Sequence, residues 1–277
     1  MKKKAVMFGF IFVISLTSLF IDVRSVFGGH LTASGCSISK EGYLSDIAKE
    51  YENQTGEQML ILGGGSVVGL HDLLGGKVDI AASCRGRTAD DPERIDYIQV
   101  AWDALVFIVH KNNPVDTITL GEARNIFAGK ITEWKELKGN DGLIIKILPS
   151  PGKGLSGVGT TLRKSVLDGK APDKTLNAIS YTSAGLVEQA IETNIMGFGV
   201  TGFSSARKRN VKMLKFNGVM PTKKNIASNR YPLKRPLYLV ISKNPRPEVK
   251  RFIDFVLSNK GQKLISSYGM VSLRDMR

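Results

Sequence analysis

The stretch Leu62-Gly-Gly-Gly-Ser-Val-Val-Gly-Leu-His-Asp-Leu-Leu-Gly-Gly-Lys-Val-Asp-Ile-Ala-Ala-Ser83 predicts a strand exit, a glycine-rich turn, a short helix and a buried strand. Its three consecutive glycines, Gly63–Gly65, let the backbone approach a ligand closely. We expect Ser66 at the N-cap position of the helix, whose leucines fall on one face. Because a helix N-terminus has free N–H groups, this arrangement suits an anion. A glycine turn of an ordinary α/β protein is the alternative.

The first 28 residues are typical of a secretory signal peptide. Lys2–Lys4 supply the positive charge, Ala5–Ile21 is apolar, and Val26-Phe27-Gly28 offers small residues for cleavage. The sequence therefore predicts a periplasmic or otherwise extracytoplasmic protein. A retained N-terminal anchor is the alternative, although the apolar run is short for a spanning helix, which needs about 20 residues.

The composition is basic, with 39 Lys and Arg against 25 Asp and Glu and a net charge of +14 in 277 residues. Such a charge attracts anions in general. There is no stripe of alternating basic and aromatic residues of the kind that single-stranded nucleic acid needs, so we expect no nucleic-acid partner. The two cysteines and three histidines lack metal-ligand spacing, so we expect no metal and no cofactor.

Strands and helices alternate along the chain, which predicts the α/β class with largely parallel sheets. Thr119 and Glu122 have the spacing of a capping box, and Leu186 is expected on the inner face of a helix capped by Ser183. The apolar stripe after residue 249 predicts one long helix that ends just before Tyr268. Further helices are expected near 44–55, 119–128 and 162–167, and strands near 60–62, 78–82, 104–109, 144–148, 197–200 and 230–241.

Four segments in this order carry a resemblance to a known family. They are the glycine loop with Val78-Asp79-Ile80-Ala81, Trp102-Asp103-Ala104-Leu105 with Asn113-Pro114, Ile126-Phe127-Ala128-Gly129-Lys130-Ile131-Thr132-Glu133-Trp134, and Tyr231-Pro232-Leu233-Lys234-Arg235-Pro236-Leu237-Tyr238. Together they resemble the phosphate-type periplasmic solute-binding proteins of ABC transporters, over nearly the whole chain after the signal.

The resemblance implies a two-lobed periplasmic-binding-protein fold with the ligand cleft between lobes joined by two crossings. Lobe 1 would comprise residues 30–110 and 232–277, and lobe 2 residues 111–231. The hinges would lie near Val109-His110 and Tyr231-Pro232, and the lobes would close on the ligand. The family implies a monomer that captures phosphate or a related tetrahedral oxyanion for a membrane ABC permease and is not an enzyme.

The resemblance also implies a ligand site made of hydroxyl and backbone N–H groups from three loops. Any of the serines would equally suit an ordinary helix cap. The implied ligand residues are Cys36, Ser37, Ser39, Gly65, Ser66, Ser83, Cys84, Arg85, Ser156, Gly157, Gly159 and Thr160.

Two departures from the family pattern bear on the identity of the anion. Cys84 stands where phosphate-binding members typically carry an aspartate that accepts the proton of the anion. The stretch before Ser156 lacks the usual arginine, and Lys153 is its one cation. Arg85 and Arg87 are candidates to compensate. Phosphate is the leading ligand, and another oxyanion is the competitor.

The fold implied by the resemblance places Cys36 and Cys84 on loops after adjacent strands. An oxidising compartment favours joining such a pair, so a disulfide between them is a hypothesis, with two free thiols as the alternative.

Two other functions stay open. The first is an extracytoplasmic cysteine-dependent enzyme that uses Cys36 or Cys84 with His71 or His110. No nucleophile-elbow or cysteine-protease signature accompanies these residues. The second is a basic polyanion-binding protein, whose binding would depend steeply on salt.

Overall fold

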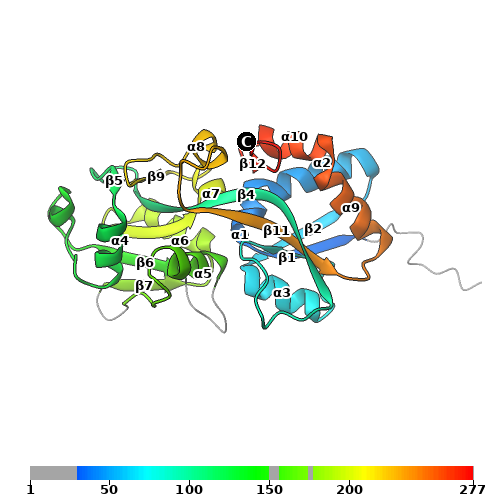
Figure 1. Ribbon diagram of the computed structural model, residues 1–277, viewed down its shortest axis with the longest axis horizontal. Coiled ribbons are helices and arrows are strands. Elements are labelled where there is room, and N and C mark those ends of the chain that lie inside the picture. The colour runs from blue at the N-terminus through cyan, green and yellow to red at the C-terminus, as the bar shows by residue number, and fades with distance from the viewer. Residues whose placement is uncertain (1–29, 150–155, 174–176, 277) are drawn as a thin grey trace, which may run out of the picture.

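The computed structural model describes residues 30–149, 156–173 and 177–276. The predicted signal peptide and Lys153 lie outside these ranges. Figure 1 shows two lobes joined by two long strands, β4 (Ile95–His110) and β11 (Lys234–Ser242), which run side by side between them. The predicted α/β class and two-lobed architecture are therefore confirmed.

Lobe 1 is built around three parallel strands, β1 (Leu31–Gly35), β2 (Met59–Gly64) and β3 (Ile80–Ser83), in the order β2-β1-β3 followed by β11 and β4. Its helices are α1 (Ser37–Ser39), the π-helical turn η2 (Lys40–Leu44), α2 (Ser45–Thr55), α3 (Ser66–Leu74), α9 (Pro247–Leu257) and α10 (Asn259–Ser267). The short strand β12 (Val271–Ser272) pairs with β4.

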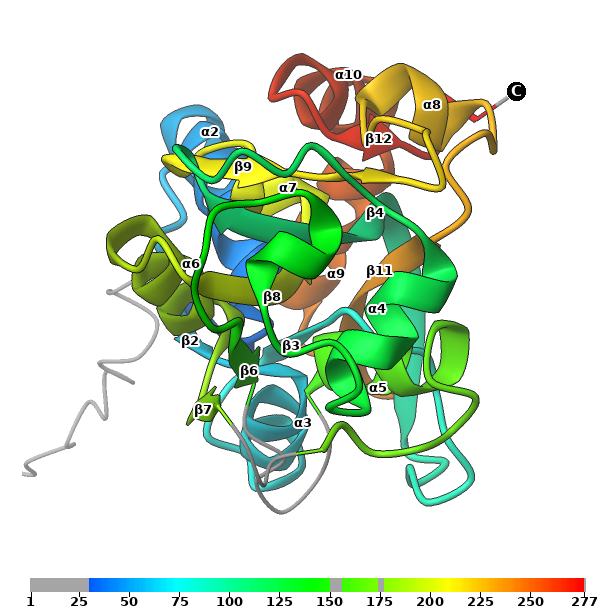
Figure 2. The same ribbon diagram turned by 90° about the vertical axis from the view of Figure 1, so that its left-hand side faces the viewer.

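Lobe 2 continues the same sheet beyond β4 through β8 (Gly197–Gly202), β6 (Ile145–Pro149) and β7 (Ala178–Tyr181), while β9 (Val211–Met213) also pairs with β4. Figure 2 views the molecule from this end. Its helices are α4 (Leu120–Phe127), η3 (Trp134–Leu137), α5 (Gly157–Ser165), α6 (Ala184–Thr193), α7 (Phe203–Ala206) and α8 (Lys223–Ala227). A separate ladder joins β5 (Thr117–Ile118) and β10 (Lys215–Phe216).

The expectation of largely parallel sheets is wrong at the middle of the molecule. Strands β1–β3 pair in parallel, as do β6–β8, but β11 is antiparallel to both β3 and β4, and β4 is antiparallel to β8, β9 and β12. The reason is topological: a strand that returns to its starting lobe beside the strand that left it must run the opposite way.

Strand β4 changes partner where the chain passes between the lobes. It pairs with β11 as far as Ala104 and with β8 from Leu105 onward. The N–H of Leu105 donates to the carbonyl of Leu233 at 2.9 Å, so β11 makes the same passage at this point. The change lies a few residues before the predicted hinge at Val109-His110. The lobe boundaries themselves stay a prediction.

The core of lobe 2 forms around the buried part of β4, which the continuous apolar run predicts correctly. Residues 104–109 are all fully buried. Phe107 of β4 stacks on Phe198 of β8 with ring centroids 5.7 Å apart, and Phe127 of α4 packs against Phe198 at 5.5 Å. The predicted capping box is present and fixes the start of α4: the Thr119 hydroxyl accepts from the N–H of Glu122, and the Glu122 carboxylate accepts from the N–H of Thr119.

Three local predictions are wrong. The C-terminal helix is broken at Ser258, whose extended backbone ends α9 and whose hydroxyl accepts from the N–H of Gly261 at 3.0 Å to start α10. Helix α5 begins at Gly157 rather than Leu162, because Ser156 caps it. Leu186 is 40% exposed, since α6 buries its neighbours Ala184 and Val187 instead.

Helix α3 lies unusually close to β1 because glycine faces glycine at their contact. A Cβ atom at Gly69 would lie 2.6 Å from the Cα of Gly35 and 2.7 Å from the carbonyl oxygen of Ser34. Both neighbours are backbone, which cannot turn aside. The start of α3 therefore reaches the carboxyl end of β1 only because this position has no side chain.

We expect Gly69→Ala to lower the free energy of unfolding by about 1–3 kcal/mol, because the added methyl group pushes α3 off β1. Gly63→Ala is the control, since a Cβ atom there meets nothing within 4 Å. Denaturant unfolding of both variants checks this. Equal stability of the two variants would contradict the contact.

Candidate functional site

The candidate site is a cleft where loops of both lobes meet below the crossing strands. Its lining comes from the starts of α1 and α3 and the end of β3 in lobe 1, and from the starts of α5 and α6 in lobe 2. The lining residues are Cys36, Ser37, Ile38, Gly65, Ser66, Cys84, Ser156, Gly157, Val158, Thr182, Ser183 and Ala184. Its empty volume is about 240 Å³, which is small because the two lobes are close together.

Backbone N–H groups at helix starts face this cleft from both lobes. Cys36 precedes α1 and Gly65, with φ of 97°, precedes α3, and neither makes a side-chain cap. Ser156 caps α5 by accepting from the N–H of Gly159 at 3.0 Å. The uncapped N–H groups of α1 and α3 carry the positive end of each helix toward the cleft.

Ser66 does not occupy the predicted N-cap position, which belongs to Gly65. Ser66 is the first residue of α3 and is fully buried. Its hydroxyl oxygen accepts from the N–H of Cys84 at 3.1 Å and lies 3.6 Å from the Cys84 Sγ atom. The left-handed backbone of Gly65 turns the chain one residue early, so this hydroxyl ties α3 to the end of β3.

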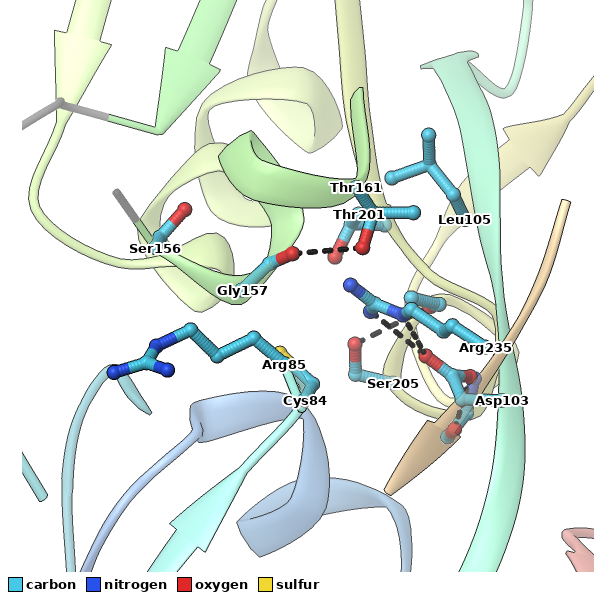
Figure 3. A network of polar contacts seen from close by, with 12 residues as sticks. Cys84, Arg85, Asp103, Leu105, Ser156, Gly157, Thr161, Thr201, Ser205 and Arg235 are labelled. Atoms are coloured by element: carbon cyan, nitrogen blue, oxygen red, sulfur yellow. Dashed lines mark hydrogen bonds and ion pairs between the residues drawn. The ribbon is translucent and has the colours of Figure 1, made fainter. Parts of the chain in front are cut away.

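Gly157 of lobe 2 packs directly against Cys84 of lobe 1. A Cβ atom at Gly157 would overlap the Sγ atom and lie 2.9 Å from the carbonyl carbon of Cys84. The start of α5 and the end of β3 therefore meet across the cleft only because this residue is glycine. Figure 3 shows the two residues facing each other.

Both cysteines are free thiols buried in the cleft, directly after the neighbouring strands β1 and β3. A hydrogen bond from Cys36, the charge of Arg235 and a hydrogen bond from Ser66 outweigh burial and lower the pKa of Cys84 to about 6. Burial and the proximity of Cys84 raise the pKa of Cys36. Of the two thiols, Cys84 is therefore the one whose deprotonation the surroundings favour. A disulfide between the two stays a prediction.

Arg85, although next to Cys84, is committed to its own loop. Its guanidinium donates to both carboxylate oxygens of Asp91, at 2.7 and 2.8 Å, and points away from the cleft in Figure 3. Arg87 donates to the carbonyls of Pro92 and Ile95. Both arginines therefore already have partners. That either arginine contacts a bound anion stays a prediction.

The cleft brings together seven of the predicted ligand residues: Cys36, Ser37, Gly65, Ser66, Cys84, Ser156 and Gly157. The other five, Ser39, Ser83, Arg85, Gly159 and Thr160, are not among the lining residues, and their roles stay predictions. Ser39 is fully buried, Ser83 donates its hydroxyl to the carbonyl of Arg85, and Gly159 and Thr160 donate backbone N–H groups to Ser156.

Sequence analysis missed two contributions to the site. Thr182 and Ser183 line the cleft from the start of α6; Ser183 was assigned only as a cap, which it also is. The second is a buried ion pair beneath the cleft, in which Nη2 of Arg235 lies 2.8 Å from a carboxylate oxygen of Asp103. Both residues belong to segments that supported the family resemblance, but nothing local signals that they meet.

The histidines required by the enzyme hypothesis lie elsewhere. His71 is on the exposed side of α3, and His110 accepts from the N–H of Asn112 at the end of β4. Neither lines the cleft. Among residues 30–149, 156–173 and 177–276, no group of three or more His, Cys, Asp or Glu is arranged to hold a metal ion. In the same ranges no helix has the length and apolarity to cross a membrane.

A wider hollow lies on the outer side of lobe 1 between α3 and α9, with an empty volume of about 820 Å³. Its charged residues are Asp79, Arg94 and Arg246, of which Asp79 and Arg246 are paired with each other at 2.8 Å. It lies within one lobe, and the single helix start on its lining, that of α9 after Arg246, has no second helix start facing it. The cleft between the lobes, where several helix starts meet, is therefore the better candidate for an anion.

A two-lobed chain with helix starts converging on a cleft between its lobes is the architecture of a solute-binding protein. Residues 28–260 match the family model of the PBP superfamily domain. The phosphate-binding protein PstS of Bacillus subtilis is 30% identical over 90% of this chain and 82% of its own length. PstS of Borreliella burgdorferi is 27% identical over 95% of this chain and 97% of its own.

Solved structures give the same relationship. A Clostridium perfringens protein described as a phosphate ABC transporter substrate-binding protein, solved with bound phosphate, superposes with a TM-score of 0.79 at 27% identity over 88% of this chain and all of the other. An ABC-type phosphate transport receptor from Vibrio cholerae superposes with a TM-score of 0.66 at 28% identity over 87% of this chain and 99% of the other. The chain belongs to the PBP superfamily, in its phosphate-type group of ABC-transporter binding proteins.

Asp91, in the loop after β3, makes the free energy of unfolding depend on pH. Burial alone would raise the pKa of Asp91, but hydrogen bonds from Arg85, Thr88 and Tyr97 hold it well below its ordinary value of 3.8. A carboxyl whose pKa is lowered by folding stabilises the fold fully above the unfolded value. That contribution is lost as the pH falls through the folded value.

We therefore expect Asp91→Asn to lower the free energy of unfolding by about 2–3 kcal/mol at neutral pH, because Arg85 loses its carboxylate. The difference from the parent protein should shrink as the pH falls below about 4. Denaturant unfolding between pH 2 and 8 checks this, with the exposed neighbour Asp90→Asn as control. A difference that does not change with pH would refute the assignment.

Proposed function

We propose that this protein is an extracytoplasmic receptor that binds phosphate, or a closely related tetrahedral oxyanion, and delivers it to the membrane permease of an ABC importer. The observation that carries the proposal is the cleft itself, where uncapped helix starts of lobe 1 face the capped start of α5 in lobe 2. Oxyanions are bound by such N–H groups together with hydroxyls, without a metal.

The names of the relatives support the same ligand. The Bacillus subtilis and Borreliella burgdorferi proteins are phosphate-binding proteins, and the Clostridium perfringens structure contains phosphate. The apolar segment at residues 5–21 supports an extracytoplasmic location, and we infer that the receptor acts there without turning its ligand over.

The two lobes are proposed to close on the anion, with α5 and β3 as the contacting edges. Closure would bury the anion and exclude water, which strengthens each hydrogen bond to it. Because Gly157 has no side chain, its backbone approaches both the Sγ atom and the backbone of Cys84 more closely than any other residue could.

Calorimetry of the chain lacking residues 1–28 against phosphate, arsenate, sulfate and molybdate tests the proposal. We expect saturable binding of at least one of these anions and a rise in melting temperature on its addition, because only the folded state binds. Failure of all four to bind at millimolar concentration would overturn the proposal.

Gly157→Ala is expected to weaken anion binding at least about tenfold, because the methyl group holds the lobes apart and the closed state loses hydrogen bonds to the anion. Gly121→Ala in α4 of the same lobe is the control, since its Cβ atom would meet its nearest neighbour at 4.0 Å. Calorimetry gives the affinities, and small-angle scattering measures closure on anion addition. Undiminished affinity and closure in Gly157→Ala would count against α5 and β3 as the contacting edges.

The lowered pKa of Cys84 predicts a pH dependence of binding. As the pH rises through about 6, Cys84 loses its proton and its negative charge repels an anion in the cleft, so affinity should fall. Cys84→Ser removes the titrating group and keeps its size. The ratio of the parent and Cys84→Ser affinities, measured by calorimetry from pH 5 to 8, cancels the ionisation of the anion itself. A constant ratio would show that Cys84 does not titrate in the site.

A further inference from the structure

Arg235 of β11 lies beneath the cleft, and one of its guanidinium nitrogens is buried without a hydrogen-bond partner. Its side chain is 4% exposed, and its Nη1 atom is completely buried without a hydrogen-bond partner. A buried N–H group of a charged side chain that donates to nothing costs free energy. Such an atom therefore points to a partner that the protein alone does not supply.

The partner cannot be Asp103, because the geometry of the ion pair is already complete. Nε and Nη2 of Arg235 both donate to one carboxylate oxygen of Asp103, at 3.1 and 2.8 Å. The other oxygen accepts the backbone N–H of Ser204 at 2.9 Å and the Ser204 hydroxyl. Since the guanidinium is planar, an edge fixed on Asp103 leaves Nη1 on the far side.

The far side of the guanidinium faces the anion cleft. Its charge acts on the sulfurs of both Cys36 and Cys84, which line the cleft. Figure 3 shows the side chain reaching from β11 toward Gly157 at the start of α5, with Cys84 on the opposite flank. Gly202 leaves room for it, because a Cβ atom there would lie 2.9 Å from Nη2.

The guanidinium of Arg235 stays protonated over the whole pH range in which the protein is folded. Burial disfavours the cation, but Cys84, Asp103 and Cys36 more than offset this and raise the pKa of Arg235 above its ordinary value. Arg85, the other arginine next to Cys84, is held by Asp91 on its own loop. Arg235 is thus the cation that the described part of the chain directs toward the cleft.

We propose that Nη1 of Arg235 donates a charge-assisted hydrogen bond to the anion bound between the lobes, and that Asp103 holds the guanidinium in the orientation this requires. Arg235 is then a ligand residue, and Asp103 a positioning residue that acts through it. This inference rests on the proposed function, because it names a further contact of the same anion.

The assignment has a consequence for lobe closure. Arg235 stands on the strand that crosses between the lobes, two residues after Leu233, whose carbonyl accepts from Leu105 where β4 changes partner. An anion held by Arg235 touches neither lobe alone but the connection between them. The starts of α5 and α6 line the same cleft from lobe 2.

The test measures phosphate affinity by calorimetry in the chain lacking residues 1–28. Arg235→Lys keeps the charge opposite Asp103 but has no second edge to offer the anion, so affinity should fall about 10- to 100-fold. The double variant Asp103→Asn/Arg235→Gln leaves no unpaired buried charge and should lose affinity to the same extent. Lys234→Gln is the matched control, because Lys234 lies over the Trp102 ring on the other face of β11 and should change affinity less than about twofold.

The outcomes separate the two proposals. If the parent protein binds no oxyanion, the proposed function falls and this inference falls with it. If the parent binds phosphate and both Arg235 variants keep its affinity, the function stands and the assignment of Arg235 is overturned. Should the variants fail to fold, nitrogen-15 spectra of the parent decide, since phosphate must shift and slow the Nη resonances of Arg235. Resonances that do not respond to saturating phosphate would refute the contact.

Discussion

The ion pair between Asp103 and Arg235 is the interaction on which the relation of the two lobes depends. The residues face each other directly in the antiparallel register of β4 and β11, the two strands that cross between the lobes. Burying two charges costs free energy unless each is fully paired. A slip of one strand by a single residue would turn one partner to the opposite face of the sheet and separate the pair. The pair therefore specifies the register of both crossings at once.

The same carboxylate links the crossing to lobe 2. Asp103 accepts from Ser204 at the start of α7, directly after β8. Gly202, at the end of β8, has no room for a side chain, since its Cβ atom would lie 2.5 Å from the Asp103 carboxylate and from Ile38 of α1. Three parts of the molecule therefore meet at this point: Asp103 of β4, Gly202 at the end of β8, and Ile38 of α1. The cleft opens immediately above it.

The features that the sequence predicts well are those set by neighbours along the chain. The capping box of Thr119 and Glu122 spans one helical turn, and the run from Ala104 to Val109 needs only apolar surroundings to become a buried strand. Helix α2 ends at Thr55 as expected, because Gly56 follows it in a left-handed conformation. These elements form wherever tertiary packing does not oppose them, so local pattern suffices.

The errors arise where a partner far along the chain decides the outcome. Ser66 looks like a helix cap, but its hydroxyl is taken by the backbone of Cys84 on the neighbouring strand. Arg85, whose part in binding stays a prediction, likewise has a partner that its neighbours along the chain do not signal, because Asp91 forms a two-bond pair with it. The pairing of Arg235 with Asp103 joins residues more than a hundred positions apart, and no local pattern in either segment predicts it. The loops of the site can be predicted from the sequence, but the charges that face into it cannot.

These distant pairings determine the charge that an entering anion meets. Asp103 neutralises Arg235 on one edge, Asp91 neutralises Arg85, and the thiolate form of Cys84 places a negative charge against the guanidinium from the cleft side. An anion arriving at Nη1 therefore competes with the thiolate for the same cation. Protonation of Cys84 relieves that competition, whereas a permanently charged carboxylate at this position would sustain it. A cysteine beside a buried arginine thus differs from a carboxylate in the charge that it places against the guanidinium, and the lowered pKa of Cys84 and the buried ion pair of Arg235 belong to one electrostatic system.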